Sequence, residues 1–240
     1  MNGKNLRLKF EHKVFDTNFF GFPVFQLHPP FIIEELETAL EMLPQNEKVL
    51  VYSFLEPESR ESAVLKSLGA NRIGLRNRYE KQVSGDIEIP DNIHLYPAGS
   101  DWNNLKLLAI QSAEYSRFAI DNNFSRQQVI DMYESWIKNA VNGEFDDCVY
   151  CAKDDNQWIG LVTLRFLKQS TEIGLIVTDK SFRGTGIGRT LLQAAQSIAG
   201  GRQGELLSVV TQAENREACA FYESAGLTMT NQEEVFHLWL

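Results

Sequence analysis

The C-terminal half of the sequence alternates between strand-like apolar runs and helical repeats. Three short apolar runs, separated by polar or turn-forming residues, predict a meander of antiparallel strands. A glycine-rich turn then opens a helix, and a buried strand, a second helix ended by Gly226 and a final strand follow. The predicted elements are the strands 149–155, 157–167 and 171–177, the turn and helix 181–199, the strand 206–212, the helix 215–224 and the strand 233–240.

The N-terminal part predicts a smaller α/β unit. A segment rich in proline, glycine and acidic residues, 84–100, reads as a linker. Two helices are then expected to open the C-terminal part, the second of them capped by Ser125. We therefore expect two domains, 1–90 and 91–240. The remaining predicted elements are an opening extended segment with the run 23–28, the helix 34–42, the strand 48–54, the helix 58–68, the strand 72–83, and the helices 101–118 and 125–142.

An internal similarity connects the two parts of the chain. The strand 48–54, its following helix and the next strand repeat the order of the last three elements at an offset of 157 residues, which aligns Gly69 with Gly226. The first copy has no glycine-rich loop, so only the C-terminal copy would keep chemistry. The alternative, that any two strand–helix–strand units look alike at this level, stays open.

Composition and charge narrow the class of protein. A chain of 240 residues with 43% apolar residues can bury a real core, which argues against disorder. The net charge of −9 repels a phosphate backbone, so we expect no nucleic-acid partner. No apolar run is long enough to span a bilayer and the start lacks a signal-peptide core, so we expect a soluble, cytoplasmic protein without membrane insertion.

The three cysteines favour packing roles in a reducing compartment. Cys148 and Cys151 have the C-x-x-C spacing, but neither a second pair nor nearby histidines follow, as a zinc site would need. Residues three apart on a strand point to opposite faces. Cys219 lies inside a helical pattern. We therefore expect no metal, and keep a metal or redox role for the pair as the alternative.

A glycine-rich loop supplies the first candidate chemistry. Arg183-Gly184-Thr185-Gly186-Ile187-Gly188 follows a strand and opens a helix, so backbone N–H groups and the positive end of a helix dipole converge there. The loop is therefore a predicted anion site. It lacks the Gly-Lys-Ser/Thr end of a Walker loop and the opening parallel βαβ unit of a Rossmann fingerprint. A mere tight turn is the plainer alternative.

R-x-x-G-x-G after such a strand resembles the acetyl-CoA signature of the GNAT N-acetyltransferase superfamily, over roughly residues 100–240. The resemblance implies an acyl-CoA N-acyltransferase domain of the α/β (α+β) class, with a mixed, mostly antiparallel sheet, preceded by the smaller N-terminal lobe. It implies that the amides of the loop hold the CoA pyrophosphate. It also implies that the backbone of Ile176 and Val177 pairs with pantetheine like an added strand, which an edge with unpaired groups permits. The implied cofactor-binding residues are Ile176, Val177, Arg183, Gly184, Thr185, Gly186, Ile187, Gly188 and Asn215.

The segment 215–226 resembles the N-x-x-A-x-x-x-Y-x-x-x-G pattern of the same superfamily. Asn215 would cap the helix and, by this resemblance, contact pantetheine. Tyr222 lies seven residues further on the same helical face, so both side chains can address one ligand. By resemblance Tyr222 is the catalytic acid that protonates the departing CoA thiolate. The alternative is that Tyr222 is a core aromatic residue.

The reaction of such a site is attack of a neutral amine on a thioester carbonyl. An amide on the open strand, for which we favour Val177, would polarise that carbonyl. The sequence does not identify the base. Glu172, Asp179, His94 and His237 are candidates, and an ordered water chain is the alternative for an amine of lowered pKa.

Three further segments resemble the dTDP-4-amino-4,6-dideoxygalactose (TDP-fucosamine) N-acetyltransferases, which join a small α/β lobe to a GNAT domain. They are 16–21, 115–118 and 138–146. The resemblance implies as acceptor the amine of a nucleotide-linked amino-dideoxysugar used for surface polysaccharide synthesis. Stacking aromatic rings and an arginine on the diphosphate would bind it in a cleft between the lobes. The implied acceptor-binding residues are Phe19, Phe20, Ser116, Arg117 and Phe118, with ordinary packing or solvation as the alternative for each.

Two other functions stay open. A GNAT enzyme acting on a protein N-terminus, a lysine or a polyamine is one, and the acidic net charge suits a polyamine. A CoA-binding sensor without turnover is the other. The fuller R-G-T-G-I-G loop departs from the dideoxysugar enzymes, whose loop can be shorter, which leaves the sugar epimer and the nucleotide open. The resemblance also allows a homodimer, but no pattern identifies an interface.

Overall fold

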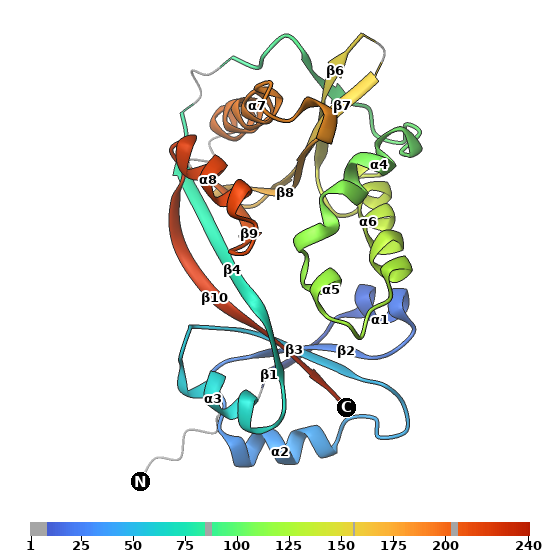
Figure 1. Cartoon of the computed structure of the whole chain (residues 1–240), viewed down its shortest axis with the longest axis vertical. Coiled ribbons are helices and arrows are strands. Elements are labelled where there is room, and N and C mark those ends of the chain that lie inside the picture. The colour runs from blue at the N-terminus through green and yellow to red at the C-terminus, as the bar shows by residue number, and fades with distance from the viewer. Residues whose placement is uncertain (1–8, 85–87, 156, 203–205) are drawn as a thin grey trace. The chain divides into compact units, whose positions relative to one another are not determined.

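The computed structural model describes residues 9–84, 88–155, 157–202 and 206–240 (Figure 1). The chain divides into two compact units, Met1–Arg76 with Gln232–Leu240, and Asn77–Asn231. Strands β4 (Asn71–Gln82) and β10 (Thr228–Trp239) contribute residues to both units. The domain boundary predicted near residue 90 stays a prediction, because a compact unit is defined by packing and not by descent.

The second unit contains the predicted meander. Its central strands β6, β7 and β8 pair antiparallel in chain order, and β8 pairs parallel with β9. An additional strand, β5, pairs antiparallel with β6. The strands are β5 (Ile93–Tyr96), β6 (Cys148–Asp154), β7 (Gln157–Phe166), β8 (Ser170–Thr178) and β9 (Leu206–Gln212).

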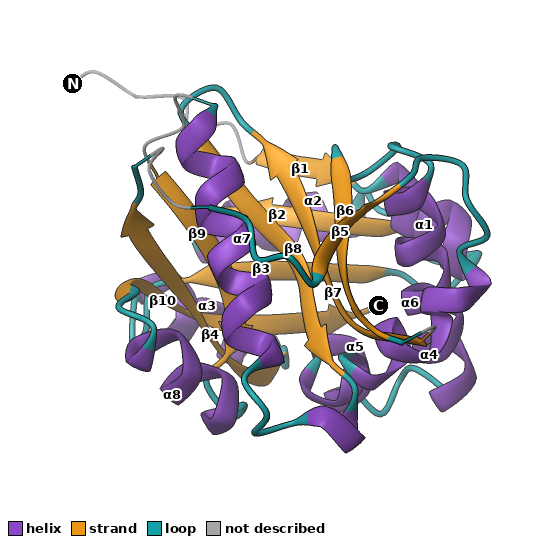
Figure 2. Ribbon diagram, turned by 90° about the horizontal axis from the view of Figure 1, so that it is seen from above, coloured by secondary structure: helices purple, strands orange, loops and turns teal. Residues whose placement is uncertain are grey.

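Helices cover both faces of this part of the sheet. On one face α7 (Ile187–Gly201) packs against β7 and β8, and buried residues of α7 and of α8 (Arg216–Ser224) share one core with Val162 and Leu164 (Figure 2). On the other face α4 (Asn103–Gln111) and α6 (Arg126–Val141) share a second core with Leu161. Leu161 thus faces one core and Val162 and Leu164 the other, as the period of two in a strand requires.

Local signals explain where these helices begin. Ser125 caps α6 in a capping box with Gln128, as the sequence predicts. The single helix expected at 101–118 is instead α4, a 3₁₀ turn η1 (Ala113–Tyr115) and the short α5 (Arg117–Ile120). Ser116 has extended backbone angles and its hydroxyl accepts a hydrogen bond from the amide of Ala119, so it starts α5 rather than continuing α4.

The first unit is the predicted small α/β part. β1 and β2 pair antiparallel, β2 and β3 parallel, and β3 pairs antiparallel with β10. The predicted extended opening is wrong for residues 14–20, which form a helix ended by Gly21 in the left-handed region. The elements are β1 (Lys9–His12), α1 (Val14–Phe20), β2 (Val24–His28), α2 (Ile33–Glu41), β3 (Leu50–Leu55) and α3 (Arg60–Ser67).

The segment expected as a linker, 84–100, is in part a strand. Residues 85–87 lie outside the described residues, and Ile93–Tyr96 form β5. Ile93 and Tyr96 are buried, in the two cores of the second unit. The flanking prolines and glycines concealed a four-residue strand, too short for its alternation to stand out.

The described strands form one sheet in the order β1-β2-β3-β10-β4-β9-β8-β7-β6-β5. This confirms the predicted fold class, an α/β (α+β) protein with a mixed, mostly antiparallel sheet and a smaller N-terminal α/β part.

The suspected repeat has a structural counterpart. β4 and β10 are both twelve residues long and start at 71 and 228, which gives the offset 228 − 71 = 157. Gly69 and Gly226, at the same offset, precede them with φ of 82° and 79°. In the sheet order β10 lies beside β3 and β4 beside β9, so the last strand of each copy neighbours the first strand of the other.

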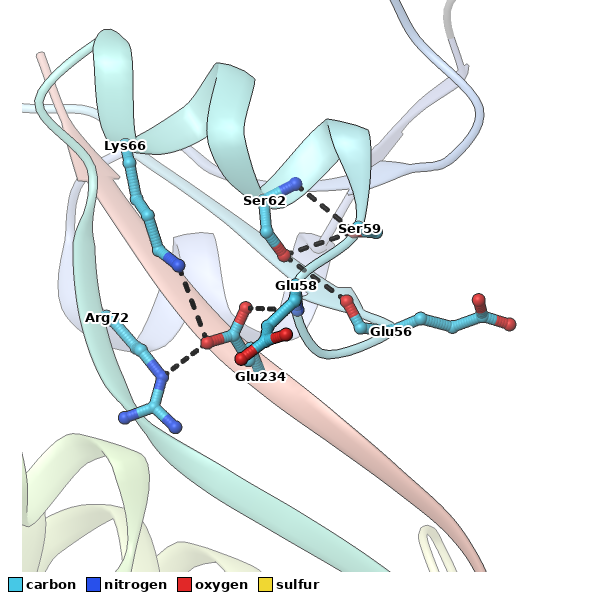
Figure 3. Close-up of polar contacts among 7 residues, drawn as sticks. All are labelled: Glu56, Glu58, Ser59, Ser62, Lys66, Arg72 and Glu234. Atoms are coloured by element: carbon cyan, nitrogen blue, oxygen red, sulfur yellow. Dashed lines mark hydrogen bonds and ion pairs between the residues drawn. The ribbon is translucent and has the colours of Figure 1, made fainter.

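A buried carboxylate fastens the end of β10 within the first unit (Figure 3). Glu234 is 4% exposed, and its carboxylate accepts from the Nε of Arg72 at 2.6 Å and from the amide of Glu58 at 3.4 Å. The Nζ of Lys66 lies at 3.6 Å. Burial alone would raise the pKa of Glu234, but hydrogen bonds from Ser62 and Arg72 and the charge of Lys66 outweigh it, so the pKa is lowered.

We expect Glu234→Gln to lower the free energy of unfolding by about 1–3 kcal/mol at pH 7, because the donors around the site lose their anion. Since folding lowers the pKa, this contribution is fully present above the unfolded value of 4.5 and is lost as the pH falls through the folded value. Urea unfolding at pH 7 and at about pH 3.5 measures both effects. Glu56→Gln is the matched control, because that exposed side chain points away from the cluster in Figure 3. Equal losses at both pH values would contradict the assignment.

Candidate active site

The pairing of β8 with β9 covers only the beginning of β8. Four residues, Ser170–Ile173, pair with Leu206–Val209, and β8 then continues to Thr178 along β7. The pairing with β9 thus ends at Ile173, in the middle of the strand. Where a strand extends past the end of its neighbour, its unpaired backbone donors and acceptors can bind a ligand.

A β-bulge lies at the point where this pairing ends. The register of β7 with β8 passes from Val162↔Ile176 to Leu164↔Ile173, so that Gly174 and Leu175 together oppose Thr163. The amide of Leu175 donates to the hydroxyl of Thr163 at 2.8 Å. A side chain thus replaces a ladder partner at the bulge.

The alternation of antiparallel hydrogen bonds indicates which amides face away from β7. The amide of Asp179 donates to the carbonyl of Ile159 at 2.8 Å, so odd-numbered positions back to Val177 direct their backbone groups toward β7. The backbone of Ile176 therefore points to the other edge. Of the two predicted pantetheine contacts, the alternation favours Ile176 over Val177.

The predicted anion loop leads into α7 from this strand. A 3₁₀ turn η2 (Lys180–Phe182) follows β8, and Gly184 and Gly186 adopt φ of 79° and 96°, a region that favours glycine. Gly186 is the N-cap of α7, so Ile187 and Gly188 open the helix. Arg183 and Thr185 are exposed, and the Thr185 hydroxyl donates to the carbonyl of Phe182. The loop is therefore at a helix N-terminus, as an anion site requires.

Close packing of α7 on the sheet depends on a glycine. A Cβ at Gly160 would lie 2.9 Å from both the Cδ1 of Leu191 and the carbonyl oxygen of Val177. Position 160 of β7 can therefore carry no side chain, and this glycine lets Ile187 and Leu191 of α7 lie close to the sheet.

Asn215 and Tyr222 lie on α8 in the same unit. The side chain of Asn215 accepts from the amide of Ala218 at 3.1 Å, which confirms its role as the helix cap. Tyr222 is 4% exposed, and its ring lies 5.5 Å from that of Tyr79. Burial, followed by the charges of Cys219 and Tyr79, raises the pKa of Tyr222, so its hydroxyl stays protonated and able to donate.

The predicted acceptor residues of the second unit cluster at α5 and α6. The hydroxyl of Ser116 caps α5 and hydrogen-bonds to Tyr133, and the guanidinium of Arg117 lies 4.2 Å from the ring centre of Phe118. Burial raises the pKa of Tyr133 to about 12. Phe118 is 2% exposed and packs on Phe124, so most of its ring is occupied by the core. Acceptor binding by these residues stays a prediction.

Phe19 and Phe20 belong to the first unit, at the end of α1. Both rings are partly exposed and contact each other edge to face at 5.1 Å, and Phe20 stacks on Phe22 at 5.6 Å. No residue of α1 is buried. Their predicted contact with an acceptor, and the predicted cleft between the lobes, also stay predictions.

The four candidate bases lie in different surroundings. Glu172 is ion-paired with Arg78 at 3.5 Å. Hydrogen bonds from Ser181 and Gln111 lower the pKa of Asp179, which makes it a weak proton acceptor. His94 is exposed on β5, and His237 is fully buried in the first unit.

A fifth carboxylate, Asp146, escaped the sequence prediction. It lies in the loop between α6 and β6 and is buried against the bulge at Gly174. In the sequence it lies beyond the predicted helix 125–142 and is the last residue of the segment 138–146 that carries the resemblance. Periodicity cannot show that such a loop folds onto a strand.

The cysteine pair lies on β6, with its two side chains on opposite faces as predicted. Cys148 packs against one core of the second unit and Cys151 lies in the other. Burial raises the pKa of Cys148 to about 11, and it raises that of Cys151 further. No cluster of three metal-binding side chains occurs in the part of the chain that the structure describes. Among the same residues, none of the helices combines the length and the apolar character needed to cross a bilayer.

Known proteins resemble this geometry. Residues 107–227, half of the chain, match the model of the acetyltransferase (GNAT) family. The uncharacterized protein YxbD of Bacillus subtilis (strain 168) is 36% identical over 73 residues, 30% of this chain and 45% of that protein. The chain therefore spans less than half the length of this relative.

Two solved structures share the fold over most of the chain. A functionally unknown conserved protein from Staphylococcus epidermidis ATCC 12228 superposes with a TM-score of 0.62 at 12% identity, over 99% of this chain and 97% of that one. A tandem GNAT protein from the clavulanic acid biosynthesis pathway superposes with a TM-score of 0.54 at 12% identity, over 90% and 75%. Identities this low compare the fold alone.

We expect Gly186→Val to weaken acetyl-CoA binding about tenfold or more, because a branched side chain cannot keep φ at 96° and the loop amides would turn away. Isothermal titration calorimetry measures the affinity. Gly99→Val is the matched control, since Gly99 has φ of 75° and open space around its Cβ position, but lies in the turn before α4. Equal loss of affinity in both variants would indicate general destabilisation instead.

Proposed function

Because the chain belongs to the acetyltransferase (GNAT) family, we propose that it is an acetyl-CoA-dependent N-acetyltransferase for the amine of a nucleotide-linked amino-dideoxysugar, such as dTDP-4-amino-4,6-dideoxygalactose. The observation that carries the proposal is the end of β8–β9 pairing at Ile173, beside a glycine-rich loop at the start of α7. This arrangement offers a strand edge and an anion site on one strand.

Backbone groups would hold the cofactor. The open edge at Ile176 matches the amides of a pantetheine chain, and the first-turn amides of α7 match a pyrophosphate. Bound acetyl-CoA would supply an activated acetyl group as a thioester. Asn215 sits at the start of α8, in the same unit, where the family resemblance places a further pantetheine contact.

Tyr222 would hold the proton needed by the leaving sulfur. Its raised pKa lies above that of an ordinary thiol, about 8.5, so complete transfer of the proton is uphill. A neutral hydroxyl can nevertheless donate a strong hydrogen bond to a developing thiolate. We therefore assign to Tyr222 stabilisation of the departing thiolate, with proton transfer following as the charge develops.

The acceptor assignment rests on the chemistry around α5. Arg117, Tyr133 and the half-buried Trp136 lie near one another and provide a guanidinium and aromatic surfaces. A guanidinium pairs with a diphosphate in two-point geometry, and aromatic faces stack on a base or sugar. A polyamine acceptor would instead be repelled by this arginine, which favours the sugar nucleotide.

We further propose that the first unit is a degenerate copy of the acetyltransferase fold. Its β3-α3-β4 order matches β9-α8-β10 at an offset of 157 residues, and the superposition of 90% of this chain on a tandem GNAT protein supports the interpretation. The turn after its β2 contains Pro29-Pro30 and no glycine-rich loop, so we assign cofactor binding to the second unit alone.

Turnover with a panel of amines tests the function. We expect purified protein to release CoA from acetyl-CoA with an amino-sugar nucleotide, from a set of dTDP-linked 4-amino-4,6-dideoxyhexoses and UDP-linked amino sugars, and not with spermidine or a peptide. Tyr222→Phe should lower kcat about tenfold or more, with little change in acetyl-CoA affinity. A chromogenic disulfide that reacts with the released thiol measures kcat, and isothermal titration calorimetry measures the affinity for acetyl-CoA.

Phe221→Tyr is the control for Tyr222→Phe, because it adds a hydroxyl on the adjacent ring and leaves the proposed donor in place. Turnover with spermidine or a peptide alone would overturn the acceptor class. Binding of acetyl-CoA without turnover of any amine would overturn the enzyme and favour a CoA sensor.

A further inference from the structure

Asp146 is a buried carboxylate with an unused hydrogen-bonding atom. The residue is 7% exposed, and its Oδ1 accepts no hydrogen bond from the described residues. The nearest cation to Oδ1 is the Nη2 of Arg165 at 3.4 Å, an ion pair without hydrogen-bond geometry. Buried polar atoms are almost always paired, so an unpaired carboxylate oxygen calls for a functional reason.

The carboxylate lies against the bulge where β8 leaves β9. A Cβ added to Gly174 would be 2.8 Å from Oδ2 of Asp146, 3.0 Å from Oδ1 and 2.7 Å from the hydroxyl of Thr163. That hydroxyl accepts from the amide of Leu175 and hydrogen-bonds to the Asp146 carboxylate. Gly174 is exposed and is the first residue of β8 after its last pair with β9.

We propose that Asp146 is the general base of the acetyl transfer, with Oδ1 accepting the proton of the acceptor amine beside Gly174. This inference rests on the proposed function, which places the thioester between Ile176 and Tyr222. Because Gly174 has no side chain, the carboxylate lies directly against the backbone of β8, at the point where pairing with β9 has ended.

The other carboxylates of this region are less suited. Glu172 lies opposite Ser208, in the part of β8 that is still paired with β9 and before the open edge begins. Its ion pair with Arg78 at 3.5 Å is comparable to that of Asp146 with Arg165 at 3.4 Å, so position and not pairing separates the two carboxylates. Asp147 is exposed and accepts from the amide of Phe166. Three charged groups act on the Asp146 carboxylate: Arg165, Glu172 and Asp147.

The surroundings of Asp146 also strengthen it as a base. Burial raises its pKa, and the hydrogen bond from Thr163 and the charge of Arg165 offset only part of that rise. A carboxylate of higher pKa accepts a proton more readily from an amine at neutral pH. The charges of Glu172 and Asp147 act in the same direction as burial.

The proton and bond balance is complete with these groups. The acceptor nitrogen forms a bond to the acetyl carbon and gives one proton to Oδ1 of Asp146. The bond between that carbon and sulfur breaks, and the sulfur takes one proton from the hydroxyl of Tyr222. Water returns the proton from Asp146 to Tyr222, so the products are the acetylated amine and free CoA.

Asp146→Asn tests the role, with the amine that the wild type acetylates best in the panel above. We expect kcat to fall about 100-fold or more while the affinity for acetyl-CoA changes less than about twofold. The deficit should narrow at high pH, where hydroxide in solvent can take the proton that the attacking nitrogen loses. A purely structural role would not give this pH-dependent recovery.

Two further variants separate chemistry from folding. Gly174→Ala keeps the carboxylate but displaces it, because the added Cβ overlaps Oδ2. It should lower kcat, and the double variant should be no slower than Asp146→Asn alone. Glu144→Gln removes a negative charge from an exposed position of the same loop, at a residue that does not act on Asp146, and should keep wild-type kcat.

Stability provides an independent readout. Since burial raises the pKa of Asp146, its ionisation costs stability as the pH rises through the folded pKa. Asp146→Asn should therefore be at least as stable as the wild type at pH 8, which thermal melting measures. Two outcomes would overturn the role of Asp146 and leave the proposed function standing. In the first, Asp146→Asn keeps its turnover within about threefold of the wild type. In the second, Glu172→Gln, and not Asp146→Asn, removes the acid limb of the pH profile of kcat. Absence of turnover by the wild type with every amine would overturn the proposed function itself.

Discussion

The structure of the second unit depends on how the backbone of β8 is satisfied along its two edges. One edge is paired with β7 along most of the strand, whereas pairing with β9 ends at Ile173. Buried backbone groups need partners, so a strand can leave an edge unpaired only where solvent or a ligand reaches it. The bulge at Gly174 and Leu175 lies at this transition, and the Thr163 hydroxyl satisfies the amide that the bulge removes from the ladder.

The neighbouring elements are arranged around that edge. Gly160 lets α7 approach β7 and β8 closely, which sets the helix N-terminus after the end of β8. On the other side of the sheet order, β9 neighbours β4, a strand that comes from the N-terminal part of the chain. Tyr79 of that strand contacts Tyr222 and donates to Glu223 at 3.0 Å. The helix that carries the proposed proton donor therefore packs on residues outside the region that matches the family model.

Sequence reasoning predicted the long periodic elements and the loop, because each has a local cause. The helical repeat of α7, the cap at Ser125 and the glycines of the loop act within a few residues. It failed for α1, whose seven residues make only two turns and include valine and phenylalanine, residue types enriched in strands, and for β5, which is too short to show a period. It also missed Asp146, because the contact of a loop carboxylate with Gly174 is tertiary and leaves no pattern in the sequence.

The burial of Asp146 against Gly174 lowers the stability of the folded state. A fold selected for stability alone would pair both oxygens of Asp146 or replace the residue, since an unpaired buried polar atom costs about 1–3 kcal/mol. Glu234 in the first unit shows the alternative within this chain, because its carboxylate is buried as deeply but is surrounded by donors, and its pKa is lowered. Two buried carboxylates thus have pKa values shifted in opposite directions. Glu234, which accepts hydrogen bonds from its neighbours, holds β10 in the first unit. Asp146, whose Oδ1 accepts none from the described residues, keeps the proton affinity that a base requires.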